Sequence, residues 1–263
     1  MNAAIDRSAP RHALRRWSLA VACIGIALGV LAVLAVVLPG PAYRYGLIGL
    51  GGAFGTIRIG AMGGIVAVAV SLAALALTLL ARRRRYALYA IFGLLLGLFA
   101  FVPPWLLVRK AGSLPAIHDI STDTVDPPQF QAILPLRAKA PNSPVYGGAE
   151  VAAKQHQAYP DIQPLHLAQA SARVMAAARE VALATGWQIV AEQADTGRLE
   201  ATATTHWFGF KDDVVIRVRP EGNGSLLDIR SESRLGGSDV GANAARIRRF
   251  SEQLQHQLGR AGS

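Results

Sequence analysis

The sequence lacks the features that most often reveal an enzyme or a disulfide-rich secreted protein. A single cysteine, Cys23, among 263 residues excludes an intrachain disulfide and a cysteine-based zinc site. There is no P-loop, G-x-S-x-G, S-x-x-K or H-E-x-x-H spacing, so no catalytic residue, metal ligand or cofactor can be assigned. Charge is also scarce, because only 17% of the residues are charged although the net charge is +10.

Charge is missing altogether from three long stretches in the first part of the chain. Residues 17–38, 59–81 and 86–108 contain no Asp, Glu, Lys, Arg or His. Each stretch is long enough to cross a hydrocarbon core of about 30 Å, and a segment in lipid must be helical to satisfy its backbone. We therefore predict a membrane region over 1–110 with three transmembrane helices. A pump or ion-coupled transporter is not expected, because such proteins need ionisable groups inside the bilayer.

The arginines that flank these stretches predict how the chain crosses the membrane. Eight of them lie on one side, in the N-terminal tail and in the link between the second and third stretches: Arg7, Arg11, Arg15, Arg16, Arg82, Arg83, Arg84 and Arg85. The other side has Arg44, Arg58, Arg109 and Lys110. Because positive residues accumulate on the cytoplasmic side, we expect a multi-pass protein of the cytoplasmic (inner) membrane. Its N-terminus would be cytoplasmic and its C-terminal domain periplasmic.

The glycine-rich link over 39–60 is expected to be a flexible or interface-lying loop.

The composition changes near Ala111, and residues 111–263 are predicted to form a separate soluble domain. This part has 15 Lys and Arg against 16 acidic residues, whereas 1–110 has 12 against one. The net charge of +10 therefore reflects membrane topology, and no nucleic-acid partner is expected. Eight prolines over 111–165 predict an extended arm or a linker at the start of the domain.

Hydrophobic periodicity in the remainder predicts an α+β domain. Helical spacing of apolar residues indicates helices over about 167–185 and 240–258. Alternation predicts four strands, over 187–192, 198–206, 213–219 and 225–234. Short turns between them imply an antiparallel sheet. We expect a two-layer domain in which a four-stranded sheet is packed by helices on one face and solvated on the other.

Charged side chains alternate with the apolar ones in these strands and would share the open face of the sheet. Glu200, Arg217, Arg230 and Arg234 are examples. Two interpretations are open: solvated cross-strand ion pairs, or a polar face whose arginines bind an anion. The turn Trp207–Phe210 is likewise either a plug for the core or an exposed aromatic tip that contacts lipid or a partner.

Three polar segments resemble motifs of the domain-of-unknown-function family 1499. They are Pro115–Asp123, Thr205–Asp213 and Asp228–Arg234, and the similarity continues through Asp239, Asn243 and Arg246. The resemblance covers about 114–258 and implies no activity, and membrane helices are a variable addition in that family. It singles out polar motif positions as candidate binding residues: His118, Asp119, Asp123, Asp212, Asp213, Arg230, Ser231, Arg234, Asp239, Asn243 and Arg246. A structural polar network would account for the same positions as well as a binding site does.

These features lead us to expect a non-enzymatic cell-envelope protein. Its periplasmic domain would bind a protein partner, membrane lipid or an anionic ligand near the membrane surface. The alternative is an envelope hydrolase or transferase that uses Asp119, Asp123, Asp212 or Asp213, with or without a cation. The same carboxylates could instead cap turns. A third hypothesis is a helper subunit that assembles through its glycine- and alanine-rich helices.

Overall fold

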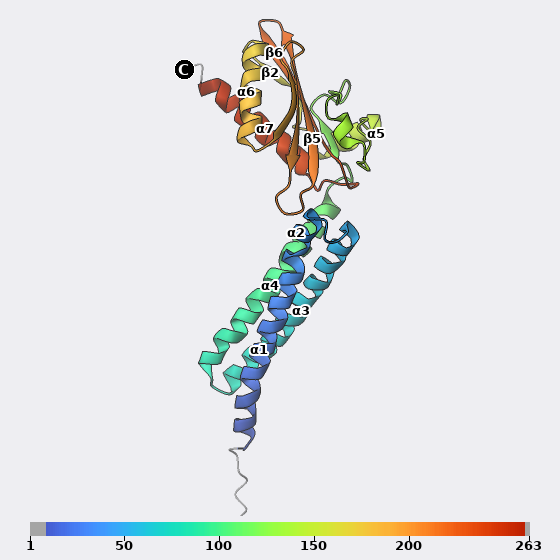
Figure 1. Cartoon of the computed structure of the whole chain (residues 1–263). Helices are drawn as coiled ribbons and strands as arrows, with labels where there is room; N and C mark the ends of the chain where they lie inside the picture. Colours follow the sequence, from blue (N-terminus) through green and yellow to red (C-terminus); the bar gives the residue numbers. More distant parts are fainter. Residues whose placement is uncertain (1–8, 261–263) are drawn as a thin grey trace, which may run out of the picture. The chain divides into compact units, whose positions relative to one another are not determined.

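The computed structural model describes residues 9–260 and places the chain in two compact units that meet between Arg109 and Lys110. The first unit contains the helices α1 (Ala9–Val37), α2 (Pro39–Arg44), α3 (Leu50–Leu80) and α4 (Arg84–Ser113), the last of which runs just past the boundary (Figure 1). Three helices are long and apolar enough to cross a membrane, which confirms the three predicted segments. Arg7, which contributed to the orientation prediction, lies outside the described residues.

The prediction of a loop over 39–60 is wrong. Helix α2 occupies the start of this stretch, and α3 begins at Leu50, nine residues before the predicted segment that starts at Ile59. Glycine weakens helices in water because it loses more conformational freedom than other residues. In an apolar environment the backbone has no water to bond with, so the helix is retained despite Gly51, Gly52 and Gly55.

Glycine lets the three long helices approach each other closely. A methyl group on Gly64 of α3 would lie 2.7 Å from the carbonyl oxygen of Gly97 of α4. A methyl group on Gly97 would likewise lie 2.7 Å from the carbonyl oxygen of Gly64. On α1, a methyl group on Gly25 would lie 2.5 Å from Oγ of Ser71. These small residues therefore serve packing within one chain, which is the role they have in many membrane helix pairs.

Substituting Gly64 by leucine should separate α3 from α4. The obstacle is a backbone carbonyl, which cannot rotate away, so we expect a loss of about 1–3 kcal/mol in the free energy of unfolding. Unfolding of the full chain by SDS in mixed micelles, followed by circular dichroism, measures this loss. Gly55→Leu is the matched control, because nothing lies within 4 Å of that position in the same helix. Equal stability of the two variants would contradict the packing described above.

The second unit is built around a six-stranded antiparallel sheet. The strands are β1 (Asp119–Ser121), β2 (Leu165–Leu167), β3 (Gln188–Gln193), β4 (Arg198–Thr204), β5 (Lys211–Glu221) and β6 (Gly224–Ser233). The order is β1-β6-β5-β4-β3, and β2 also pairs with β6, at residues 225–227, whereas β1 pairs with residues 230–232 of the same strand. The helical elements are the 3-10 helix η1 (Leu134–Arg137), α5 (Gly148–Ala158), α6 (Ser171–Ala184) and α7 (Ala242–Arg260). Helices α6 and α7 lie on one face of the sheet, and α5 lies on the other side (Figure 1).

The predicted antiparallel sheet is confirmed, but the predicted number of four strands is wrong. The two additional strands come from the proline-rich arm, and each has only three residues. Alternation cannot be recognised over so short a run. Leu167, which we expected at the start of the predicted helix 167–185, lies in β2 instead. That helix, α6, begins at Ser171.

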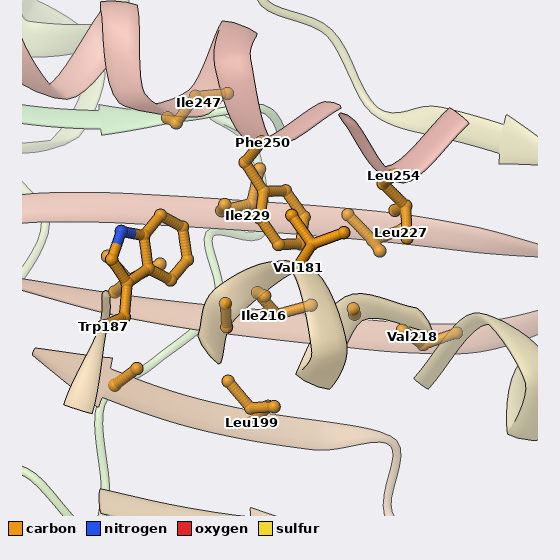
Figure 2. Packing of buried hydrophobic residues seen from close by; sticks show 14 of the residues in the cluster. Val181, Trp187, Leu199, Ile216, Val218, Leu227, Ile229, Ile247, Phe250 and Leu254 are labelled. Carbon is orange, nitrogen blue, oxygen red and sulfur yellow. The ribbon is translucent and has the colours of Figure 1, made fainter. Parts of the chain in front are cut away.

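The main core lies between the sheet and the helices α6 and α7. Figure 2 shows Val181 of α6 and Phe250 of α7 meeting Ile216 and Ile229 of the central strands. Trp187 stacks on Phe250 with 5.3 Å between the ring centroids. All residues of this cluster come from the second unit, so the unit has a core of its own.

The opposite face of the sheet is covered by the arm, so the expectation of a solvated face is wrong. Phe130 and Ile133 of the arm pack on Val215 of β5 and form a second, smaller cluster. The charged residues between these apolar contacts are consequently buried as well. Glu200, Asp213 and Arg230 are fully inaccessible to solvent.

Candidate functional site

The polar face of the sheet is organised by the register of β4, β5 and β6. Thr202 lies opposite Asp213, which lies opposite Glu232 on the next strand. In each strand, the side chains that alternate with the core-facing ones therefore form a row on the face that the arm covers. The acidic and basic side chains of this face, together with the arm residues that bond to them, are called the arm–sheet network below.

Arg230 of β6 is the largest fully buried side chain in this network. Its Nε and Nη2 donate to the two carboxylate oxygens of Asp119 at 2.9 and 2.8 Å. Its Nη2 also donates to the carbonyl of Pro144 at 2.9 Å, and its guanidinium lies 4.7 Å from the ring centroid of Phe130. The donors of the Arg230 guanidinium are therefore satisfied by the Asp119 carboxylate and by protein carbonyls.

A second cluster joins the arm to the end of the sheet. Arg137 of η1 donates to Asp213 at 2.8 Å and to Glu232 at 2.7 Å. Arg234 donates to both oxygens of Asp213 at 2.8 Å and to the carbonyl of Leu136 at 3.0 Å. Asp213 thus binds two guanidinium groups, and both arginines are satisfied mainly from within the chain.

The other acidic residues of this face also have partners within the chain. Glu200 accepts the backbone N–H groups of Gln131 and Ile133 at 2.9 and 3.0 Å. Asp123 accepts the N–H groups of Val125 and Asp126 through one oxygen, as a turn-capping carboxylate does. Its other oxygen lies 3.2 Å from Arg217.

The helix-covered face carries a separate polar network. Asp212 is adjacent to Asp213 in β5 and therefore points to the opposite face, where it pairs with Arg246 of α7. Asn243 accepts from the hydroxyl of Ser231 at 2.7 Å and donates to the backbone carbonyl of His118 at 2.9 Å. This network ties the entry of the domain to β6 and to α7.

Asp239 caps α7 from the preceding loop. Its carboxylate accepts the N–H groups of Gly241 and Asn243 at 2.8 and 2.7 Å, which satisfies donors at the start of the helix. Burial raises the pKa of Asp239 above its ordinary value. The observed contacts of Asp239 thus stabilise the start of α7.

The eleven predicted site residues therefore divide between two faces of the sheet. Asp119, Asp123, Asp213, Arg230 and Arg234 belong to the arm–sheet network. His118, Asp212, Ser231, Asp239, Asn243 and Arg246 belong to the helix side, and His118 takes part through its backbone carbonyl. In residues 9–260, no group of three or more His, Cys, Asp or Glu side chains is arranged to hold a metal ion.

Sequence reasoning missed Arg137, which bonds to two strands from a position in the arm. Its partner Asp213 is 76 positions away, and no periodic pattern marks a single arginine in a proline-rich segment. Glu232 was visible as a charged residue of the polar sheet face, but it was not among the predicted site residues. Its alternation with Ser231 and Ser233 in β6 was the available signal.

A profile of the family described as a protein of unknown function, DUF1499, matches residues 119–254, which is more than half of the chain. The chain belongs to the DUF1499 family. The match begins at Asp119, the partner of Arg230, and it ends in α7, so it spans the polar networks on both faces. No curated protein matches the chain.

Burial has the largest effect on the titratable groups at the centre of the DUF1499 domain. Burial and the nearby carboxylate of Asp119 raise the pKa of Glu232 to about 8, although Arg137 and Arg230 act in the opposite direction. Burial likewise raises the pKa of Tyr146, whose ring lies beside Arg230, to about 12. The neutral form of Glu232 still accepts a hydrogen bond from Arg137 through its carbonyl oxygen.

Proposed function

We propose that the DUF1499 domain of this chain is a non-catalytic module that binds the anionic surface of the membrane in which the chain is anchored. The chain would be a multi-pass protein of the inner membrane, with a cytoplasmic N-terminus and the domain in the periplasm. The excess of arginines on the two flanks described above supports this orientation.

The observation that carries the proposal is a set of exposed residues at one end of the sheet. The chain enters the domain there, because β1 begins at Asp119 opposite Glu232, near the end of β6. β4 ends and β5 begins at the same end, where Lys211 accepts the backbone N–H of Arg234. We define the entry-end surface as the exposed side chains Leu136, Lys139, Trp207 and Lys211.

The aromatic turn between β4 and β5 supplies the apolar part of this surface. Phe208 is buried and stacks on Phe210 with 4.9 Å between centroids, which holds the turn rigid. Trp207 packs edge-on against Phe208 but is 41% exposed. Phe208 is thus the buried residue of this turn, and Trp207 is its exposed aromatic side chain.

The chemistry of the entry-end surface suits a lipid interface. Tryptophan favours the level of the lipid headgroups, and each lysine near an anionic surface contributes about 1 kcal/mol. Neither Lys139 nor Lys211 has a side-chain partner among residues 9–260. Only five residues, 114–118, separate α4 from β1, and they span at most about 18 Å. Because this short tether raises the local lipid concentration, weak affinity is sufficient.

The contacts of the aspartates do not support the alternative, a hydrolase or transferase. Asp212 and Asp213 point to opposite faces of the sheet, and Asp119 is taken up by Arg230. A general acid–base pair or a shared cation needs carboxylates that converge on one accessible point. The buried arginines are also already neutralised, so an anion would have to bind at exposed cations instead.

Binding of the domain to vesicles tests the proposal. The fragment 114–263, which contains the whole core of the unit, should bind phosphatidylglycerol vesicles more tightly than phosphatidylcholine vesicles in a sedimentation assay. The double variant Lys139→Gln/Lys211→Gln should bind about 30-fold more weakly, since two lysines contribute about 2 kcal/mol. Trp207→Ala should lower the affinity about tenfold.

Matched controls separate a defined surface from general charge. Lys154→Gln/Arg173→Gln removes the same net charge from exposed positions of α5 and α6, and Val125→Ala removes apolar surface from a fully exposed arm residue. Both controls should bind like the wild type. The proposal is wrong if the control pair weakens binding as much as the lysine pair does, or if the folded fragment binds neither type of vesicle.

A further inference from the structure

The turn between α3 and α4 concentrates positive charge without any counter-charge in its own unit. Arg82, Arg83, Arg84 and Arg85 are consecutive, and the segment 9–109 contains no Asp or Glu. The structure gives these four guanidinium groups no carboxylate partner within residues 9–260. Charges so close together repel one another, and an anion from outside the chain would reduce this repulsion.

The backbone of this turn adopts a conformation that arginine disfavours. Arg82 has a φ of +52°, and Arg83 donates its N–H to the carbonyl of Thr78 at 2.8 Å. This arrangement closes many helices, usually with glycine at the position that Arg82 occupies here. An arginine at this position adds a guanidinium group to the run at the expense of local backbone strain.

An open cavity of about 640 Å³ adjoins the arginine run. It is lined by Arg85, Tyr86, Leu88, Tyr89 and Phe92, all from the first three turns of α4. Arg85 donates to the hydroxyl of Tyr86 at 3.0 Å and lies 4.8 Å from the centroid of that ring. Leu88 and Phe92 are 70% and 52% exposed, so the apolar part of the lining is accessible from outside the helix bundle.

We infer that this cavity holds one anionic phospholipid. The lining begins with a cation and a phenol, Arg85 and Tyr86, and ends with the apolar ring of Phe92, seven positions after Arg85 and about 10 Å along a helix. A phospholipid changes in the same order, from phosphate to glycerol ester to acyl chain. Guanidinium groups bind phosphate oxygens in pairs, and the hydroxyl of Tyr89 is a further donor. This site lies in the membrane unit and is independent of the entry-end surface.

Native mass spectrometry of the full chain in detergent micelles tests the site. Added phosphatidylglycerol should bind at least tenfold more tightly than phosphatidylcholine. The variant Arg83→Lys/Arg85→Lys should lower phosphatidylglycerol binding about tenfold, because lysine keeps the charge, and with it the topology signal, but loses the paired geometry. Inorganic phosphate in excess should not displace the bound lipid, because phosphate lacks acyl chains for Leu88 and Phe92.

The matched control is Arg58→Lys/Arg109→Lys. Arg109 lies 4.9 Å from the ring centroid of Trp105 and so forms a comparable arginine–aromatic pair near the other end of α4. This control should retain wild-type phosphatidylglycerol binding. Equal lipid binding by the Arg83→Lys/Arg85→Lys variant and the wild type would overturn the site. Equal loss in both double variants, or complete displacement by phosphate, would overturn it too.

Discussion

Substituting Arg230 by alanine is expected to lower the free energy of unfolding of the DUF1499 domain by about 3–5 kcal/mol at pH 7. The guanidinium group is fully buried and forms a paired contact with Asp119. Removing it leaves the Asp119 carboxylate at the β1–β6 contact without its main partner, and a stranded buried charge is among the most costly defects. The carbonyl of Pro144 would lose its donor as well.

Urea unfolding of the fragment 114–263 provides the measurement. Arg219→Ala is the control, because Arg219 also pairs with a buried aspartate, Asp228, but its side chain is 41% exposed. We expect that control to cost about 1 kcal/mol or less. The double variant Arg230→Met/Asp119→Leu should recover much of the loss, since it removes both charges of the buried pair. A loss below about 1 kcal/mol for Arg230→Ala would contradict the network as described.

The membrane segments show how well composition alone predicts the positions of the long helices. Three uncharged runs of more than twenty residues can only be helices in lipid, and each run coincides with a helix of the structure except for one terminal residue in 17–38 and in 59–81. The start of α3 was misplaced because the predicted segment began after the charge of Arg58, and the seven glycines between 39 and 60 indicated a loop. Gly60 instead brings α3 against the backbone of α1 near Ala32, a close contact that no one-dimensional pattern shows.

The strands of the soluble domain were predictable in proportion to their length. β4, β5 and β6 have 7, 11 and 10 residues, enough for alternation to mark which side chains face the core. β1 and β2 have three residues each and form only because the edge of β6 offers them partners. The arm therefore looked like a linker, and the face that it covers looked open to solvent.

Some members of the arm–sheet network could be predicted from the sequence, but their connections could not. Asp119, Asp213, Arg230 and Arg234 were identified as polar positions that packing does not require. Whether such residues form a binding site or a structural network depends on contacts between distant segments, such as the 111 positions between Asp119 and Arg230. In the structure these contacts satisfy the buried arginines, so exposed cations remain as candidates for binding an anion.

Glu232 should make the stability of the domain decrease as the pH rises from about 5 to 8. Its carboxyl has a pKa of about 8 in the folded domain, against 4.5 for the ordinary group. Between these values the folded state keeps a proton that the unfolded state has released, so the free energy of unfolding falls with increasing pH. The slope contributed by one such group approaches about 1.4 kcal/mol per pH unit in this window and vanishes above it.

The variant Glu232→Gln isolates this effect, because glutamine still offers a carbonyl oxygen to Arg137 but does not titrate. Urea unfolding of fragment 114–263 at pH 5, 6, 7 and 8 should show a steeper decline for the wild type than for the variant. Asp239 also has a raised pKa, and its contribution has the same sign in both proteins, so it cancels in the difference. Parallel pH profiles would mean that Glu232 is ionised throughout this range. The two arginines would then outweigh the burial of the carboxyl and its proximity to Asp119.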